Sequence, residues 1–452
     1  MSPMYIIVII VLSIALLIFL TVKAKLHPFF ALTLSSFFFG ILAGHSVPNI
    51  IKAYSSGLGG TISGIGVVIA IGTVMGALLE HSGAAETMAN TILQITGKKN
   101  ADIGLAVTGY FVSIPVFCDS AFVLLSPLAR RMSKDSGKSM TAMAVALAMG
   151  LHATHMLVPP TPGPLAVAGI LGANLGLVIL LGMLVSIPVT IVAIIAGRYF
   201  GKKFFFLPDI ETAEEIVQET GKKNLPSPLM SFLPIVLPIC LMLLRTIATL
   251  QSHPLGTGII FNIVDAIGQT IVALFIGLII AFFAYKSVHP NDKDVWTFDG
   301  IFGEALKTAG QIVLIVGAGG AFATVLRLSN LQEIVMNTFT GMSIGIIVPY
   351  IIGAIFRTAI GSGTVGMITA ASMLVPLLNV LGFNTPIGLV VAMLSCAAGG
   401  FMVFHGNDDF FWVVTSTSGM KPEIAYKVFP IISVFQSLTA LLCVYILKII
   451  FL

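Results

Sequence analysis

Charged residues are scarce in this sequence. Only 9% of its 452 residues are aspartate, glutamate, lysine or arginine, whereas 57% are hydrophobic. A soluble domain of average composition carries about a quarter charged residues, so an ordinary soluble protein is excluded. The mean hydropathy of +1.04 indicates a polytopic integral membrane protein held in a lipid bilayer. The net charge of +4 comes from loop lysines and arginines and gives no support to nucleic-acid binding.

Cysteine is equally scarce. The four cysteines lie in apolar runs, without C-x-x-C or Cys/His spacing, which argues against disulfides and zinc. Buried thiols are expected at these positions, which are Cys118, Cys240, Cys396 and Cys443. The sequence also lacks a nucleotide-binding motif, a phosphate loop and an H-E-x-x-H motif, so no cofactor and no metal is predicted.

Long apolar runs fill most of the chain. A helix crosses a bilayer with about 20 residues, and the candidate runs lie near 4–22, 28–48, 61–80, 103–129, 139–158, 174–197, 229–250, 266–285, 307–326, 343–379, 385–404 and 429–451. Asp119 interrupts the fourth run and Arg357 the tenth, so each of these is expected to enter the membrane, break and turn back. The predicted fold class is all-α, with about ten full spans plus two re-entrant hairpins, or 12–14 hydrophobic segments.

Basic residues orient these segments. If both termini lie outside, most lysines and arginines fall on one side, which is then the cytoplasm. A long polar linker, residues 201–231, is expected to be cytoplasmic. It joins an N-terminal half, residues 1–200, to a C-terminal half, residues 232–452.

The two halves resemble each other in order. Glu86 is matched by Glu333, 247 positions later (333 − 86), and His155 by His405, 250 positions later (405 − 155). The spans that open the two repeats run in opposite directions in this topology. Inverted repeats are therefore predicted, as in many secondary transporters. Their cores are expected at about residues 61–197 and 307–452.

Polar residues interrupt the apolar run 103–129. Asp119 is followed by Ser120, and a carboxylate facing lipid here would cost roughly 2.5–3.5 kcal/mol. Asp119 is therefore expected to face a cavity or to carry a proton. A structural carboxyl, hydrogen-bonded to the backbone at the hairpin tip, is the alternative.

A proline-rich segment, residues 158–164, follows His155. It contains four prolines and Thr161, and is expected to be non-helical with carbonyl groups free to face a solute. His155 is a candidate for proton transfer or hydroxyl binding. A metal site formed with His152 lacks a third ligand nearby.

Two polar groups lie in the C-terminal half. Arg357 offers a fork that fits a carboxylate, and Ser362 and Thr364 offer hydroxyls beside a helix N-terminus. Pairing of Arg357 with a protein carboxylate is the alternative. Asn407 and Asp408 form the second group, and their alternative is placement at the membrane interface beside an aromatic cluster.

These motifs resemble the gluconate permease family, the gluconate:proton symporters and their relatives for other small hydroxy acids and D-serine. The resemblance covers nearly the whole chain. The matching segments are 27–32, 80–86, 114–117 with Asp119, 154–155, 159–160, 162–164, 317–320, Arg357, 361–362, 364–365, His405, 407–408 and 411–412. It implies proton-coupled uptake across the bacterial inner membrane by a multi-pass protein of the ion transporter superfamily. Such folds move a transport domain against a scaffold like an elevator.

The chain departs from the gluconate-type pattern at three places. Thr161 occupies the position of a histidine, residues 118–121 read Cys-Asp-Ser-Ala, and Asp409-Phe410 replaces small residues or proline. All three lie at candidate site positions. The identity of the transported acid therefore stays open.

The sequence thus predicts a proton-coupled symporter, not an enzyme, that imports gluconate or a related sugar acid or small hydroxy carboxylate. The predicted substrate-binding residues are Asp119, Ser120, Thr161, Arg357, Ser362, Thr364, Asn407 and Asp408. The predicted proton-coupling residues are Asp119, His155, His405 and Asp408. Transport of D-serine or another small carboxylate is an alternative, as are a membrane-embedded enzyme and a channel. The expected partners are the organic acid, protons and the bilayer, and a homodimer is left open.

Overall fold

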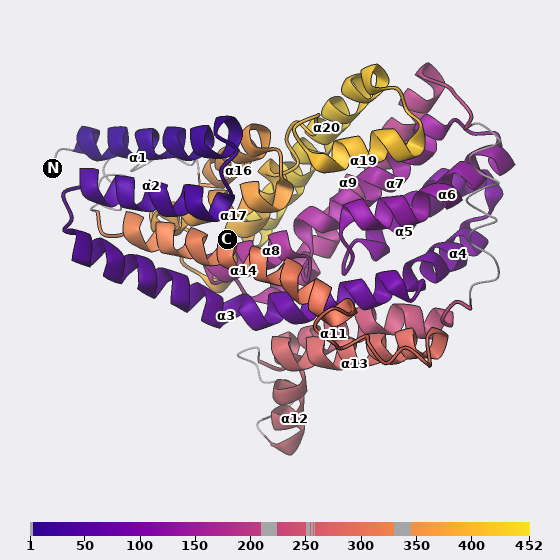
Figure 1. Ribbon diagram of the computed structural model, residues 1–452, viewed down its shortest axis with the longest axis horizontal. Helices are drawn as coiled ribbons and strands as arrows, with labels where there is room; N and C mark the ends of the chain where they lie inside the picture. The colour runs from indigo at the N-terminus through magenta and orange to yellow at the C-terminus, as the bar shows by residue number, and fades with distance from the viewer. Residues whose placement is uncertain (1–2, 209–223, 250–253, 255, 257, 330–344) are drawn as a thin grey trace.

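The structure, a computed structural model, describes residues 3–208, 224–249, 254, 256, 258–329 and 345–452. Every regular element in these ranges is helical, as the sequence predicted. Most long helices run roughly along the long axis of the molecule (Figure 1). Half of the predicted linker, and Glu333 of the predicted repeat, lie outside the described residues.

The helices divide between the two halves of the chain. The N-terminal half contains α1 (Pro3–Ile18), α2 (Pro28–Leu42), α3 (Val47–His81), α4 (Ala84–Thr96), α5 (Ala101–Val112), α6 (Cys118–Ser136), α7 (Met140–Leu157), α8 (Pro162–Leu171) and α9 (Leu175–Lys203). The C-terminal half contains α11 (Pro228–Ala248), α12 (Ile259–Ile267), α13 (Thr270–Val288), α14 (Ile301–Leu326), α16 (Ile347–Ile360), α17 (Gly363–Leu374), α18 (Pro386–Gly399), α19 (Asp409–Ser418) and α20 (Pro422–Phe451).

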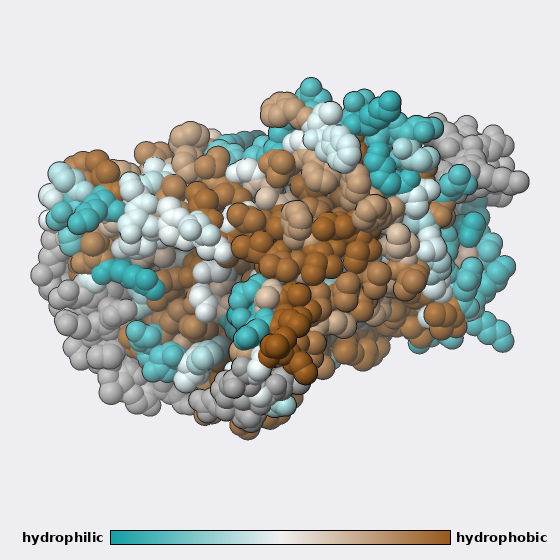
Figure 2. Space-filling view, turned by 90° about the horizontal axis from the view of Figure 1, so that it is seen from below, coloured by the Kyte–Doolittle hydropathy of each residue, from teal (hydrophilic) through white to brown (hydrophobic). Residues whose placement is uncertain are grey.

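The membrane-crossing helices match the predicted apolar runs. Within the described residues, eight helical segments are long and apolar enough to cross a membrane by length and composition. Two other predicted spans, 28–48 and 385–404, coincide with the shorter helices α2 and α18, so the total of ten remains a prediction. In Figure 2, apolar residues dominate the middle of one face and polar residues gather toward its ends. This pattern is typical of a protein whose middle is surrounded by lipid.

Two hairpins lie where the sequence predicts helices that turn back. α5 and α6 are joined by a non-helical tip, residues 113–117. α16 and α17 are joined at Gly361 and Ser362. Gly361 has a φ of +87°, and a side chain there would overlap the Asn407 carbonyl oxygen, so glycine is needed for both reasons.

A broken helix accompanies each hairpin. Residues 158–161 separate α7 from α8, and residues 400–408 separate α18 from α19. The prediction of a non-helical segment through residue 164 was wrong, because α8 begins at Pro162. Proline is tolerated in the first turn of a helix, where backbone N–H groups have no partner within the helix.

The hairpins and broken helices pack in a reciprocal pattern. Within each half, the first hairpin arm lies against the first part of the broken helix: α5 against α7, and α16 against α18. Between the halves, the second arm lies against the second part of the opposite broken helix: α6 against α19, and α17 against α8. This crosswise packing brings the breaks of both halves to one region of the molecule.

Glycines set the close approach of the first arms. A methyl group on Gly109 of α5 would lie 2.8 Å from the Leu147 carbonyl oxygen of α7, and one on Gly353 of α16 would overlap the Cys396 carbonyl oxygen of α18. Gly353 follows Gly109 by 244 positions (353 − 109), and Cys396 follows Leu147 by 249 (396 − 147).

A second pair of contacts follows the same two offsets. A methyl group on Gly150 would lie 2.5 Å from the Ala106 carbonyl oxygen, and one on Gly399 would overlap the Tyr350 carbonyl oxygen. The separations are again 244 positions (350 − 106) on the hairpin arm and 249 (399 − 150) on the broken helix. Glycine thus allows close helix contacts in both halves, at matching separations along the chain.

Replacing Gly353 with alanine is expected to destabilise the protein by about 1–3 kcal/mol, because the added methyl group has no space against α18. Thermal unfolding of the purified chain in detergent measures this change. Gly64→Ala is the matched control, since Gly64 lies within α3 with no other atom within 4 Å of the added methyl. Equal melting temperatures for the two variants would contradict the packing argument.

Candidate functional site

A cavity of about 520 Å³ lies where the breaks of the four helix pairs meet. This volume falls within the roughly 300–1,000 Å³ range of small-molecule sites. Its walls come from both hairpin tips, the end of α7, the segment before α19 and one face of α14. The polar residues that line it are Asp119, His152, His155, Thr308, Gln311, Ser362, Thr364, Asn407, Asp408 and Asp409.

Arg357, in the last turn of α16, lies directly behind this lining. Its side chain is 1% exposed, and Nη2 donates a hydrogen bond of 2.5 Å to Asp408 Oδ2. Within the described residues, Nε and Nη1 are buried without a hydrogen-bond partner. The guanidinium carbon also lies 5.7 Å from the centre of the Phe404 ring. A buried guanidinium with only one of its groups satisfied retains the capacity to bind a further anionic oxygen.

Asp408 links the second hairpin to the second broken helix. Besides the contact with Arg357, its Oδ1 accepts a hydrogen bond of 2.9 Å from the Phe410 N–H and so caps α19. Asn407 adds a second link, because its Nδ2 donates to the Thr358 carbonyl oxygen at 2.9 Å. The alternative in which Arg357 pairs with a protein carboxylate is therefore present in this conformation.

Asp119 differs from Asp408 in its surroundings. It lies in the first turn of α6, is exposed to the cavity, and forms no ion pair within the described part of the chain. Its carboxylate is therefore free to exchange a proton or to contact a solute.

The two histidines of α7 line the cavity. His152 is 3% exposed, and its ring centre lies 5.1 Å from that of Phe401 and 5.5 Å from that of Phe404. Nδ1 of His152 and Nδ1 of His155 have no hydrogen-bond partner in the described residues. Both of these nitrogens are buried, so neither is open to the cavity in this conformation.

The structure separates the predicted site residues into two groups. Those that line the cavity together are Asp119, His155, Ser362, Thr364, Asn407 and Asp408. Ser120 lies outside it, in an adjoining cavity. Thr161 is buried, and its hydroxyl donates to the carbonyl oxygens of Val158 and His155. His405 is partly buried outside the lining.

Several lining residues were not among the predicted site residues. Thr308 and Gln311 come from α14, and Phe117 forms part of the first hairpin tip. A lone amide at position 311, near the start of the apolar run 307–326, is a signal that could have identified this face of α14. Asp409 and His152 were noted in the sequence but were not assigned to the site.

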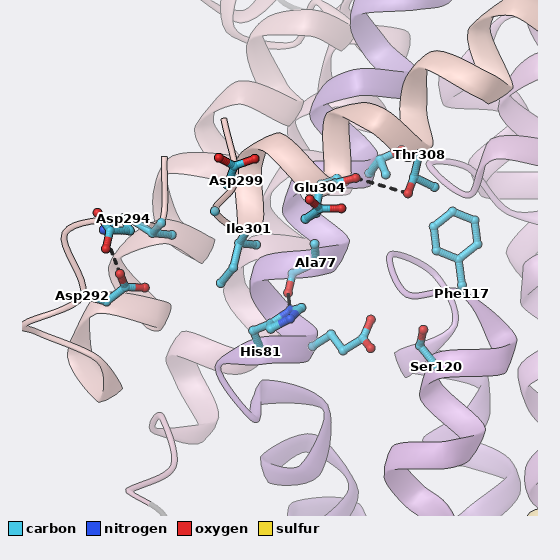
Figure 3. A pocket seen from close by; sticks show the side chains of 15 residues that line it. Ala77, His81, Phe117, Ser120, Asp292, Asp294, Asp299, Ile301, Glu304 and Thr308 are labelled. Carbon is cyan, nitrogen blue, oxygen red and sulfur yellow. Dashed lines mark hydrogen bonds between the residues drawn. The ribbon is translucent and has the colours of Figure 1, made fainter. Parts of the chain in front are cut away.

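A second cavity of about 530 Å³, here called the acidic chamber, adjoins the first and shares Phe117 and Thr308 with it. Figure 3 shows Phe117 and Ser120 on one side of the chamber and Asp292 and Asp294 on the other. Its carboxylates are Glu80, Asp292, Asp294, Asp299 and Glu304. Phe117 and Ser120 line the chamber together with Glu80, so the chamber reaches the first hairpin tip.

The chamber is negatively charged on the side of the loop before α14. The Tyr285 hydroxyl donates a hydrogen bond of 2.5 Å to Asp292 Oδ2. This hydrogen bond lowers the pKa of the Asp292 carboxyl, which is therefore ionised at neutral pH. The acidic chamber beside the cavity thus favours cations over anions.

A helical membrane protein in which hairpins and broken helices surround one polar cavity has the construction of a transporter. The comparisons with known proteins agree with this class. The chain belongs to the GntP family of permeases, because the family description "GntP family permease" matches residues 5–450. It is accordingly a multi-pass membrane permease rather than an enzyme, as the sequence predicted.

Individual relatives cover nearly the whole chain. A gluconate permease of Pseudomonas aeruginosa is 32% identical over 443 residues, which is 96% of this chain and 95% of that protein. The D-serine transporter DsdX of Escherichia coli is 32% identical over 449 residues, 97% of each protein. The Alcanivorax borkumensis YdaH transporter has a similar fold, with a TM-score of 0.67 and 15% identity over 94% of this chain and 98% of that chain.

Proposed function

We propose that this permease is a proton-coupled symporter of the bacterial inner membrane that imports gluconate or a related sugar acid or small hydroxy carboxylate. Arg357 carries this proposal, because its buried guanidinium retains two N–H groups without a partner in the described residues. A carboxylate that took the place of Asp408 at Nη2 would form two parallel hydrogen bonds, one with Nη2 and one with either Nε or Nη1. The relationship to a gluconate permease supports the same substrate class.

Substrate binding then requires a rearrangement of the Arg357–Asp408 pair. Nε and Nη1 are closed off from water in this conformation, and Asp408 stands between the guanidinium and the cavity. An arriving carboxylate competes with Asp408 for Arg357. The hydroxyls of Ser362 and Thr364 and the amide of Asn407 contact the polyol part of the substrate.

The two halves form inverted repeats that move as an elevator. The equivalent glycine contacts and the reciprocal packing of hairpins on broken helices support an internal repeat. The cavity has one wall from α14, whereas the others come from the hairpins and broken helices. The hairpins and broken helices form the moving domain. The helices α3 and α14, which pack along each other, belong to the scaffold.

Uptake is expected to follow the proton gradient. The full chain in liposomes that are alkaline inside should accumulate labelled gluconate, and a protonophore should abolish the accumulation, because a proton must accompany the substrate. Saturation with rising gluconate concentration distinguishes a carrier from a channel. Sodium-driven uptake that persists with the protonophore would overturn proton coupling.

A second candidate substrate is a small amino acid such as D-serine, the substrate named for DsdX. The cavity is lined by Asp119, Asp408 and Asp409, while Arg357 supplies one compensating positive charge behind them. An ammonium group would balance this excess of negative charge, whereas a sugar acid would not. Competition of unlabelled D-serine and sugar acids against the same labelled substrate separates the two candidates.

A further inference from the structure

Three cations surround a small cavity at the end of α9. The cavity, of about 290 Å³, lies between α5, α7, α9 and Phe205. Lys138, Arg198 and Lys202 line it, and Asp102 is the one carboxylate among its lining residues. The cavity therefore carries an excess of two positive charges, and it shares no lining residue with the cavity of the candidate functional site.

Asp102 fixes two of these cations. Its carboxylate is 1% exposed, and its two oxygens each accept one hydrogen bond of 2.5 Å, from Lys138 Nζ and from Arg198 Nε. Arg198 is engaged through Nε, so its two terminal nitrogens stay available on a side chain that is 48% exposed. Within the described residues, Lys202 has no ion pair or hydrogen bond of its side chain.

The length of α9 is sufficient to carry the cavity to the depth of the lipid headgroups. Arg198 follows Leu175, the first residue of α9, by 23 positions (198 − 175), or about 35 Å along the helix. This length exceeds the hydrocarbon core of about 30 Å, so a helix that enters the bilayer near Leu175 brings Arg198 to the level of the phosphate groups. The end of α9 belongs to the side that the basic loops mark as cytoplasmic.

An apolar stripe leads to the cations along the same helix. Ile191, Ile195 and Tyr199 are spaced four residues apart and are 48%, 62% and 61% exposed. Residues three and four apart share one face of a helix, so Ile195 lies one turn before both Tyr199 and Arg198. A lipid whose phosphate meets the cations can therefore lay its acyl chain on this stripe.

We propose that this cavity binds the phosphate headgroup of an anionic phospholipid, held by Lys202, Arg198 and Lys138. Basic groups between membrane helices on the cytoplasmic side attract such headgroups. The apolar stripe selects a lipid over free phosphate, and the excess charge selects an anionic lipid over a zwitterionic one. Asp102 acts as a positioning residue that holds two of the cations toward the headgroup.

Native mass spectrometry of the full chain in detergent, titrated with phosphatidylglycerol, tests the proposal. Lys202→Gln is expected to weaken phosphatidylglycerol binding by about fivefold, because the attraction of one cation to the anionic headgroup is lost. Lys202→Arg keeps this charge and should preserve binding. Lys203→Gln is the matched control, since Lys203 lies in the same helical turn but does not line the cavity. Its Nζ lies 5.7 Å from the centre of the Phe204 ring. This control variant should bind like the parent.

Three results would overturn the lipid site. Equal losses in Lys202→Gln and Lys203→Gln would mean that the lipid responds to general surface charge. Equal binding of phosphatidylethanolamine would mean that the cavity does not select an anionic lipid. Displacement of phosphatidylglycerol by inorganic phosphate at similar concentration would mean that the cavity does not select a lipid over free phosphate. None of these results depends on which acid the protein transports.

Discussion

Replacing Arg357 with lysine is expected to lower the affinity for the transported acid by about ten- to a hundredfold. Lysine keeps the positive charge and can still face Asp408, but it lacks the planar fork that offers two parallel N–H groups to a carboxylate. The loss of one or more charge-assisted hydrogen bonds, at roughly 1.5–3 kcal/mol each, sets this range. Equilibrium binding of labelled acid to the purified protein measures it.

The control for Arg357→Lys is Arg245→Lys. Arg245 also pairs with a carboxylate, Asp265, at 2.9 Å, but it joins α11 to α12 away from the cavity. Both variants should insert and express like the parent, and only the first should lose affinity. If Arg357→Lys binds the acid as tightly as the parent, Arg357 serves only to hold the second hairpin against Asp408.

The fold was largely predictable because its signal is local. Apolar runs of about 20 residues mark membrane helices whatever they pack against, and each of the twelve predicted runs contains a helix in the described residues. Asp119 and Arg357 disclosed the two hairpins, since ionisable residues at membrane depth need a protected place. The short helices α4 and α12 carry no comparable signal and were not predicted.

The site was less predictable because it depends on side-chain direction. Asp119 and Ser120 are neighbours in sequence, yet one lines the cavity and the other the acidic chamber, because successive residues of a helix point about 100° apart. Thr161 is one of the residues that depart from the family pattern, but its hydroxyl bonds to the preceding backbone instead of facing the cavity. Such contacts follow from tertiary packing, which spacing along the chain does not encode.

Packing also distinguishes the candidate proton carriers. Asp408 is held by Arg357 and by the N–H group that it caps, so both of its oxygens are engaged. His405 lies outside the cavity lining. Asp119 and His155 retain access to the cavity without an ion pair in the described residues, which makes them the better candidates for coupling.

Replacing Asp119 with asparagine is expected to abolish accumulation driven by the pH gradient. Asparagine has nearly the same shape and can contact the same solute, but it does not bind and release a proton. Exchange of internal for external substrate needs no net proton movement and should persist. Counterflow and gradient-driven uptake, measured on the same liposomes, separate these two activities.

Asp409→Asn provides the matched control for this prediction. Like Asp119, Asp409 lines the cavity and lies in the first turn of a helix. Its replacement with asparagine removes the same negative charge. Coupling should survive this substitution if the proton resides on Asp119. Loss of coupling in both variants would assign the effect to the total charge of the cavity. Full coupling in Asp119→Asn would leave His155 as the group that carries the proton, because its ring lines the same cavity.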